Sequence, residues 1–199
     1  MRITPDIRVV LPIFTVFLVF SSGCTIPDTS TTSTGVPGYT LPAQGSADIA
    51  FLSLYESSGA DIATRLENVH RCFPAETAVR NVPYMATDLR TAALELKGAA
   101  DTYHTTMIKI GPFEMKEHEL QRNEYLKYLS TIRKSAGDIA GAAEGELNGE
   151  FGLAQTYAES AKISLKNPVG IPGSSHEHLL KEIGDSLDDY IQKMRGKRI

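Results

Sequence analysis

Apolar residues recur at alternating steps of three and four through most of the chain beyond residue 47. This spacing keeps them on one side of an α-helix, whereas the alternation by twos that is typical of a strand is nowhere sustained. Four such stripes are present. They are Leu52, Tyr55, Gly59, Ile62, Leu66, Val69 and Phe73; Val82, Met85, Leu89, Ala92, Leu96, Ala99 and Tyr103; Tyr125, Leu129, Ile132, Ala136, Ile139 and Ala143; and Leu180, Ile183, Leu187, Tyr190 and Met194. The pattern predicts an all-α domain.

Narrow stripes of this kind are typical of long helices that pack at shallow angles. We therefore expect an antiparallel up-and-down helical bundle of four long helices, with one shorter helix at about 150–166 between the third and the last. The bundle domain would occupy residues 47–199. Its length is sufficient for one domain with its own hydrophobic core.

Residues that favour helix ends lie between the stripes. Asn81 is placed to cap the second helix, with Pro83 in its first turn. Gly111-Pro112 separates the second helix from the third, and Glu114 would lie at the positive end of the third helix dipole. Ser174 and Glu177 have the spacing of a capping box for the last helix.

Gly137, Gly141, Gly145 and Gly149 recur at every fourth residue near the end of the third helix. Each glycine in a helix interior costs about 1 kcal/mol relative to alanine, so the series needs a reason. We expect the third helix to bend and stop near Asn148. A mobile hinge is the functional alternative.

The chain begins with a different kind of segment. Val9–Phe20 is an apolar run of twelve residues that follows a short region containing Arg2 and Arg8. As a helix it would span roughly 18 Å, too short for a hydrocarbon core of about 30 Å. The length is that of the apolar region of an export signal, and we assign residues 1–23 to a signal helix.

Ser21-Ser22-Gly23-Cys24 follows the apolar run directly. Small residues before a cysteine resemble the lipobox of prokaryotic lipoprotein precursors, although Ser21 stands where an aliphatic residue is usual. The resemblance implies that Cys24 is lipidated and becomes the first residue of the mature protein. An ordinary secretory signal cut near Ser22, or an uncleaved anchor, are the alternatives.

Residues 24–46 would form a tether. Nine of the residues from Thr25 to Ser46 are Ser or Thr, three are Pro, and Asp28 is the single charge. Such a composition cannot bury enough apolar surface to become ordered. The Thr-rich segment is similar to the tethers of archaeal surface lipoproteins, and the resemblance ends at about residue 46. It implies a cell-membrane location, on the extracytoplasmic side.

Charge and motifs limit the functions of the bundle. Removal of residues 1–23 leaves 18 basic and 23 acidic side chains, a net charge of −5, which does not favour nucleic acid as a partner. Phosphate loops, zincin helices, nucleophile elbows and dinucleotide fingerprints do not occur in the sequence. We therefore expect neither catalytic residues nor a cofactor.

Two sequence pairs have metal-ligand spacing. Glu67-x-x-His70 matches the Glu-x-x-His motif of di-iron bundles and Asp101-x-x-His104 resembles it loosely, but each pair flanks its apolar stripe instead of lying on it. His176-Glu177-His178 offers too few convergent ligands for a dedicated site. We expect no metal site, a solvated helix end at His176–His178, and Cys72 as a small apolar filler.

One polar group falls in the frame of an apolar stripe. His118 and Arg122 extend the third stripe backwards from Tyr125, so the three side chains are candidates for ligand binding between helices. An open bundle end that reaches water is the simpler alternative.

Two functions are consistent with these features. The first is a non-catalytic lipid-anchored envelope protein that displays a helical bundle as a binding or structural module, with the membrane and an envelope protein as partners. The alternative is an extracytoplasmic sensor or solute-capture domain with a pocket near His118, Arg122 and Tyr125.

Overall fold

The computed structural model describes residues 46–197, which form six α-helices and contain no strand. The all-α class predicted from the apolar periodicity is confirmed. The expected signal helix, Cys24 and the tether up to residue 45 lie outside the described residues, and Ser46, the last residue assigned to the tether, begins the first helix. The helices are α1 (Ser46–Arg71), α2 (Pro74–Val79), α3 (Ala86–Ile108), α4 (Lys116–Leu147), α5 (Phe151–Leu165) and α6 (Ser174–Lys197).

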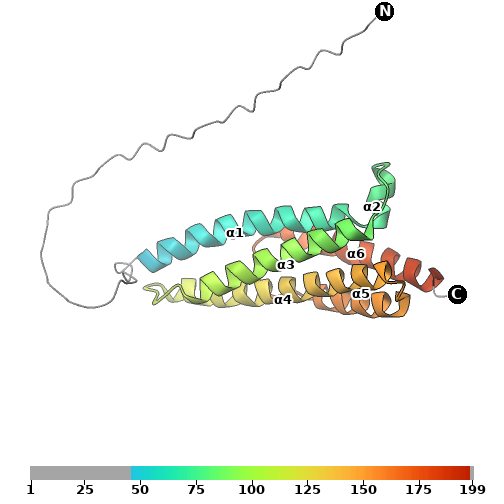
Figure 1. Cartoon of the computed structure of the whole chain (residues 1–199). Coiled ribbons are helices and arrows are strands. Elements are labelled where there is room, and N and C mark those ends of the chain that lie inside the picture. Colours follow the sequence, from blue (N-terminus) through green and yellow to red (C-terminus); the bar gives the residue numbers. More distant parts are fainter. Residues whose placement is uncertain (1–45, 198–199) are drawn as a thin grey trace, which may run out of the picture. The chain divides into compact units, whose positions relative to one another are not determined.

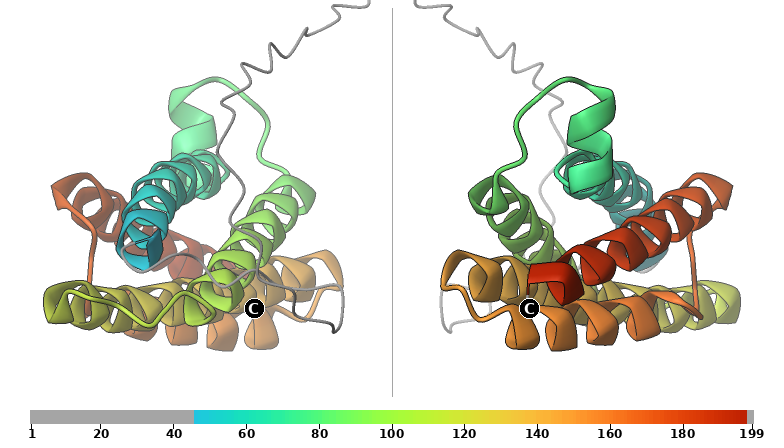
Figure 2. Two further views of the ribbon diagram at one scale, coloured as in Figure 1. Left: turned by 90° about the vertical axis from the view of Figure 1, so that its left-hand side faces the viewer. Right: turned by 90° about the vertical axis from the view of Figure 1, so that its right-hand side faces the viewer.

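Five of the helices form a closed ring around one core (Figures 1 and 2). In chain order each packs against the next, and α6 returns to pack against α1. Arg133 of α4 contacts Asp101 of α3, and Arg90 of α3 contacts Glu144 of α4, so these two helices run in opposite directions. Neighbouring helices in the ring run in opposite directions. Because the ring has an odd number of helices, one neighbouring pair must be parallel, and that pair is α1 and α6.

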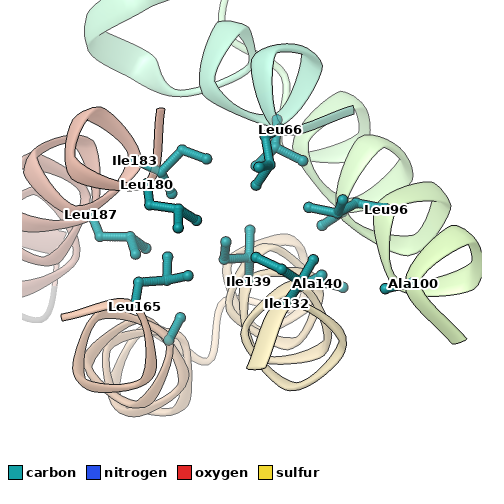
Figure 3. Close-up of a cluster of buried hydrophobic side chains, with 14 of the residues drawn as sticks. Leu66, Leu96, Ala100, Ile132, Ile139, Ala140, Leu165, Leu180, Ile183 and Leu187 are labelled. Atoms are coloured by element: carbon teal, nitrogen blue, oxygen red, sulfur yellow. The ribbon is translucent and has the colours of Figure 1, made fainter. Parts of the chain in front are cut away.

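The core is built from the predicted stripes (Figure 3). Leu66 of α1, Leu96 of α3, Ile132 of α4 and Ile183 of α6 point into it and are buried. Every member of the stripes in α4 and α6 is buried. Burial of each large aliphatic side chain stabilises the fold by about 1.5–3 kcal/mol.

The prediction for the first stripe was wrong at its first residue. Leu52 is 37% exposed, and Phe51 is fully buried in its place. A step of four from Tyr55, instead of three, reaches Phe51 and keeps it on the core side of the helix. Phe51 packs edge-on against Phe113 and beside Tyr55.

The predicted start of the second long helix was also wrong. Val82 and Met85 are exposed, and α3 begins at Ala86 with Met85 as its N-cap. The intervening chain forms α2, with Pro74 in its first turn, followed by a turn at Asn81. Pro83 disfavours a helical conformation for Val82, so α3 cannot extend back to Asn81.

The N-cap of α6 falls one residue earlier than expected. The carbonyl of Gly173 accepts hydrogen bonds from the N–H groups of His176 and Glu177, which makes Ser174 the first helical residue. By contrast, the shorter helix predicted at about 150–166 is confirmed as α5. The predicted stop near Asn148 is also confirmed, since Asn148 is the C-cap of α4.

The glycine series allows α4 and α5 to approach closely. A Cβ atom at Gly145 would lie 2.9 Å from the backbone nitrogen of Ala154, and one at Gly141 would lie 3.1 Å from the ring of Tyr157. Gly137 faces α3, where the flexible side chain of Lys97 lies at 3.7 Å. At Gly141 and Gly145, therefore, the missing side chain makes room for α5.

Candidate functional site

The start of α1 is fastened to the start of α4. Asp48 Oδ2 accepts a hydrogen bond of 2.9 Å from the N–H of Glu114, and Asp48 Oδ1 lies 2.5 Å from Nδ1 of His118. The backbone hydrogen bond from Glu114 is the main reason why the pKa of Asp48 is lowered. Asp48 thus supplies the negative charge near the N-terminus of α4 that the sequence suggested for Glu114.

Arg122 is held against the chain between α3 and α4. One guanidinium nitrogen donates a 2.7 Å hydrogen bond to the carbonyl of Ile110, and the group lies 4.9 Å from the centre of the Phe113 ring. Arg122 Nε is buried without a hydrogen-bond partner among the described residues. The guanidinium therefore fixes the loop before α4.

Tyr125 is fully buried and forms a hydrogen bond of 3.0 Å with the hydroxyl of Ser58 on α1. Burial raises its pKa to about 12. His118, Arg122 and Tyr125 thus lie on α4 as predicted, but each contacts a different protein group. Neither of the two cavities described below is lined by any of them.

A polar contact that joins three helices was not predicted from the sequence. His176 on α6 is 5% exposed, and its Nδ1 forms a hydrogen bond of 2.7 Å with the hydroxyl of Tyr128 on α4. The ring also interacts with the backbone of Gly59 on α1, which acts against the effect of burial on its pKa. The expectation of a solvated helix end at His176 is wrong. His176 lies four residues before Leu180, in the frame of the α6 stripe, and that spacing was a usable signal.

The buried imidazole makes stability depend on pH. Burial lowers the pKa of His176 below its ordinary value of 6.5, so the unfolded chain binds the proton more tightly than the folded chain does. We expect the free energy of unfolding to fall as the pH drops below about 6.5, by at most about 1.4 kcal/mol per pH unit for this one group. Urea unfolding followed by circular dichroism between pH 7.5 and 5.5 measures the slope.

Replacing His176 with Gln should remove the contribution of this residue to the slope. His178→Gln is the matched control, because His178 is exposed on the same helix turn. An equal slope in the wild type and in His176→Gln would contradict the assignment.

A second polar cluster lies at the other end of α4. The Glu146 carboxylate accepts hydrogen bonds from Tyr84 and Lys197 at 2.7 Å each, and Lys193 lies 3.3 Å away. Burial raises the pKa of Glu146, but the hydrogen bonds from Lys197 and Tyr84 and the charge of Lys193 outweigh it, so the pKa is lowered. Part of the basic end of α6 therefore pairs with α4.

Three of the four residues in the two pairs with metal-ligand spacing have other partners. Glu67 pairs with Arg71, Asp101 with Arg133, and His70 lies 3.5 Å from Glu76. Within residues 46–197, no group of three or more His, Cys, Asp or Glu side chains is arranged to hold a metal ion.

Cys72 is half-buried beside the core. Burial raises the pKa of its thiol. A raised pKa leaves little of the thiolate, which is the nucleophilic form, at neutral pH.

A groove of about 760 Å³ lies between α5 and α6. Its floor contains the buried side chains of Leu165 and Leu180, and the connector 166–173 closes one end. Lys162 of α5 and Asp188 of α6 form an ion pair between the two helices. Asp188 is the last residue of α6 that lines the groove. The volume lies in the range of small-molecule sites. We call this cavity the α5–α6 groove.

The smaller cavity, of about 340 Å³, lies between α1 and α3. Asp61 accepts hydrogen bonds there from Arg65 at 2.9 Å and from Tyr103 at 3.1 Å, and Arg65 also reaches Glu95. Its charged groups are therefore paired with one another.

None of the helices in residues 46–197 combines the length and the apolar character needed to cross a membrane. No protein-family model matches the chain, and neither a curated protein nor a solved structure shows significant similarity to it.

Proposed function

We propose that the chain is a non-catalytic lipid-anchored protein of the cell envelope, which displays a helical bundle on the extracytoplasmic side as a binding or structural module. The observation that carries the proposal is the order of three sequence segments: an apolar run, the lipobox-like Ser21–Cys24, and the Thr-rich tether. A diacylglyceryl group on Cys24 would supply the two acyl chains that firm anchoring needs.

The geometry at the start of the bundle agrees with this proposal. Ala47 and Asp48, the first residues after the tether, are already buried, and Asp48 is bonded to the start of α4. A tether ending at residue 46 would therefore join the bundle at a fixed point, where three polar contacts connect α1 to the rest of the domain.

Substitution of Cys24 by Ser tests the anchor. Serine cannot form the thioether to lipid, so we expect the variant to leave the membrane fraction and the wild type to remain there. Cell fractionation with immunoblotting measures the distribution. The intact mass of the wild type should show loss of residues 1–23 and a gain of lipid.

Cys72→Ser is the matched control, because it removes the other cysteine and should stay in the membrane. A Cys24→Ser protein that remains in the membrane at the normal processed size would overturn the proposal. An unmodified wild-type mass that begins near Gly23 would have the same meaning.

The second candidate function is capture of a small solute, and the α5–α6 groove is the observation that favours it. The groove has an apolar floor and charged walls, which is the usual construction of a ligand site. This differs from the position suggested by the sequence, because His118, Arg122 and Tyr125 do not line it.

A further inference from the structure

The walls of the α5–α6 groove carry unpaired charges of both signs. Among the described residues, Lys166 and Lys181 form no ion pair with a carboxylate, and Glu177 and Asp185 form none with a basic side chain. These side chains are exposed, and along α6 Lys181 lies one helical turn from Glu177 on one side and from Asp185 on the other, so the two signs alternate at steps of about 6 Å. A short ligand with both an ammonium and a carboxylate group would match this alternation, whereas a ligand with one charge would match one sign only.

The shape of the groove limits the size of its ligand. On α6 the lining extends from Ser174, next to the connector 166–173, to Asp188, whose ion pair with Lys162 bridges α5 and α6, so the groove does not continue as an open channel between the two helices. Between them, Leu165, Leu180 and Ile171 offer apolar contact. A short molecule with an apolar body fits this outline better than a protein segment does.

We propose that the α5–α6 groove binds short zwitterionic peptides with apolar side chains. The peptide carboxylate contacts Lys166 and Lys181, its ammonium group contacts either Glu177 or Asp185, each one helical turn from Lys181 on α6, and its side chains lie over the apolar floor. The inference rests on the solute-capture function proposed above and names its ligand class. It does not depend on the lipid at Cys24.

The charged groups are exposed, so each of their contacts with the peptide contributes modestly. The probe is the dipeptide leucyl-leucine, and isothermal titration calorimetry measures its binding to the full chain in lipid nanodiscs. We expect N-acetylation, which removes the ammonium charge, to weaken binding about two- to fivefold. C-terminal amidation should weaken binding by a similar factor, and the double variant Lys166→Gln/Lys181→Gln should make amidation ineffective.

Gly184 offers a way to fill the groove without disturbing the core. It lines the groove on α6, and a Cβ atom there meets no other atom within 4 Å. We expect Gly184→Leu to weaken leucyl-leucine binding at least tenfold while α6 stays folded, as judged by circular dichroism. Gly196→Leu is the matched control, since Gly196 is also unobstructed but lies outside the groove.

Octanoate has an apolar tail and only a carboxylate. Its binding distinguishes the claim that the groove captures solutes from the claim that its ligands are zwitterionic. If octanoate binds and Gly184→Leu blocks it, while leucyl-leucine does not bind, the groove captures solutes but the zwitterionic class is wrong. If neither probe binds, or if Gly184→Leu leaves binding unchanged, the groove is not the capture site. Equal affinities for leucyl-leucine and its two blocked forms would also overturn the charge assignment.

Discussion

Replacing Gly170 with alanine is expected to lower the free energy of unfolding by about 3 kcal/mol. Gly170 lies in the connector between α5 and α6 with a φ of +75°, a conformation that is unfavourable for alanine. A Cβ atom there would also lie 2.2 Å from the backbone carbonyl oxygen of Glu124 on α4. Because the obstacle is backbone, the connector itself must move. Urea unfolding followed by circular dichroism measures the change.

The variant Gly149→Ala separates the cost of the backbone conformation from the cost of the contact with Glu124. Gly149 has nearly the same φ, +74°, but a Cβ atom there meets nothing within 4 Å. We expect a loss of only about 1 kcal/mol, which is the cost of the backbone conformation alone. Equal losses in the two variants would mean that the connector does not lie against α4 as closely as the structure places it.

The same connector forms one end of the α5–α6 groove, so a substitution at Gly170 also affects the shape of the groove. If Gly170→Ala displaces the connector, the groove changes shape while the residues on α5 and α6 remain. The fold of the connector and the proposed binding site are therefore coupled through one close backbone contact.

The sequence predicted those parts of the fold that depend on local periodicity. The stripes of α4 and α6 are long and unambiguous, and all their members are buried. Errors arose where the pattern allows two continuations. Both Phe51 and Leu52 lie one helical turn before Tyr55, and only packing against Phe113 decides between them.

Short segments between long helices were not predictable in the same way. The six residues of α2 are too few to show a helical period. Val82 and Met85 continue the α3 frame by coincidence, although they precede the helix. Pro83 favours an extended conformation for Val82, and the prediction that Pro83 lies in a first helical turn was wrong.

The candidate sites depend on contacts between distant parts of the chain. Asp48 and His118 are 70 residues apart, and no local pattern joins them. The α5–α6 groove is likewise a product of how two helices diverge from their connector. By contrast, the burial of His176 was within reach of the sequence, because it lies in the frame of the α6 stripe.

Alanine substitutions along the α4 glycine series should have unequal effects, and Gly145→Ala should be the most harmful. The new Cβ atom would press on the backbone nitrogen of Ala154 at 2.9 Å, so α5 must shift as a whole. We expect a loss of about 2 kcal/mol despite the higher helix propensity of alanine. Thermal and urea unfolding both report it.

Gly137→Ala and Gly141→Ala are the matched variants on the same helix. At Gly137 the nearest atoms belong to the flexible side chain of Lys97 at 3.7 Å, so alanine should stabilise the fold by up to about 1 kcal/mol. At Gly141 the obstacle is the partly exposed ring of Tyr157, which can rotate, and the two effects should nearly cancel.

The ranking of the three alanine variants distinguishes two explanations of the glycine series, close packing against α5 and a hinge in α4. If the glycines serve as a hinge, each alanine would stiffen α4 by a similar amount, and all three variants would gain stability together. Close packing predicts opposite signs at Gly137 and Gly145, because only Gly145 faces the backbone of α5. Three stabilised variants would therefore exclude the packing explanation, whereas a loss confined to Gly145 would exclude the hinge.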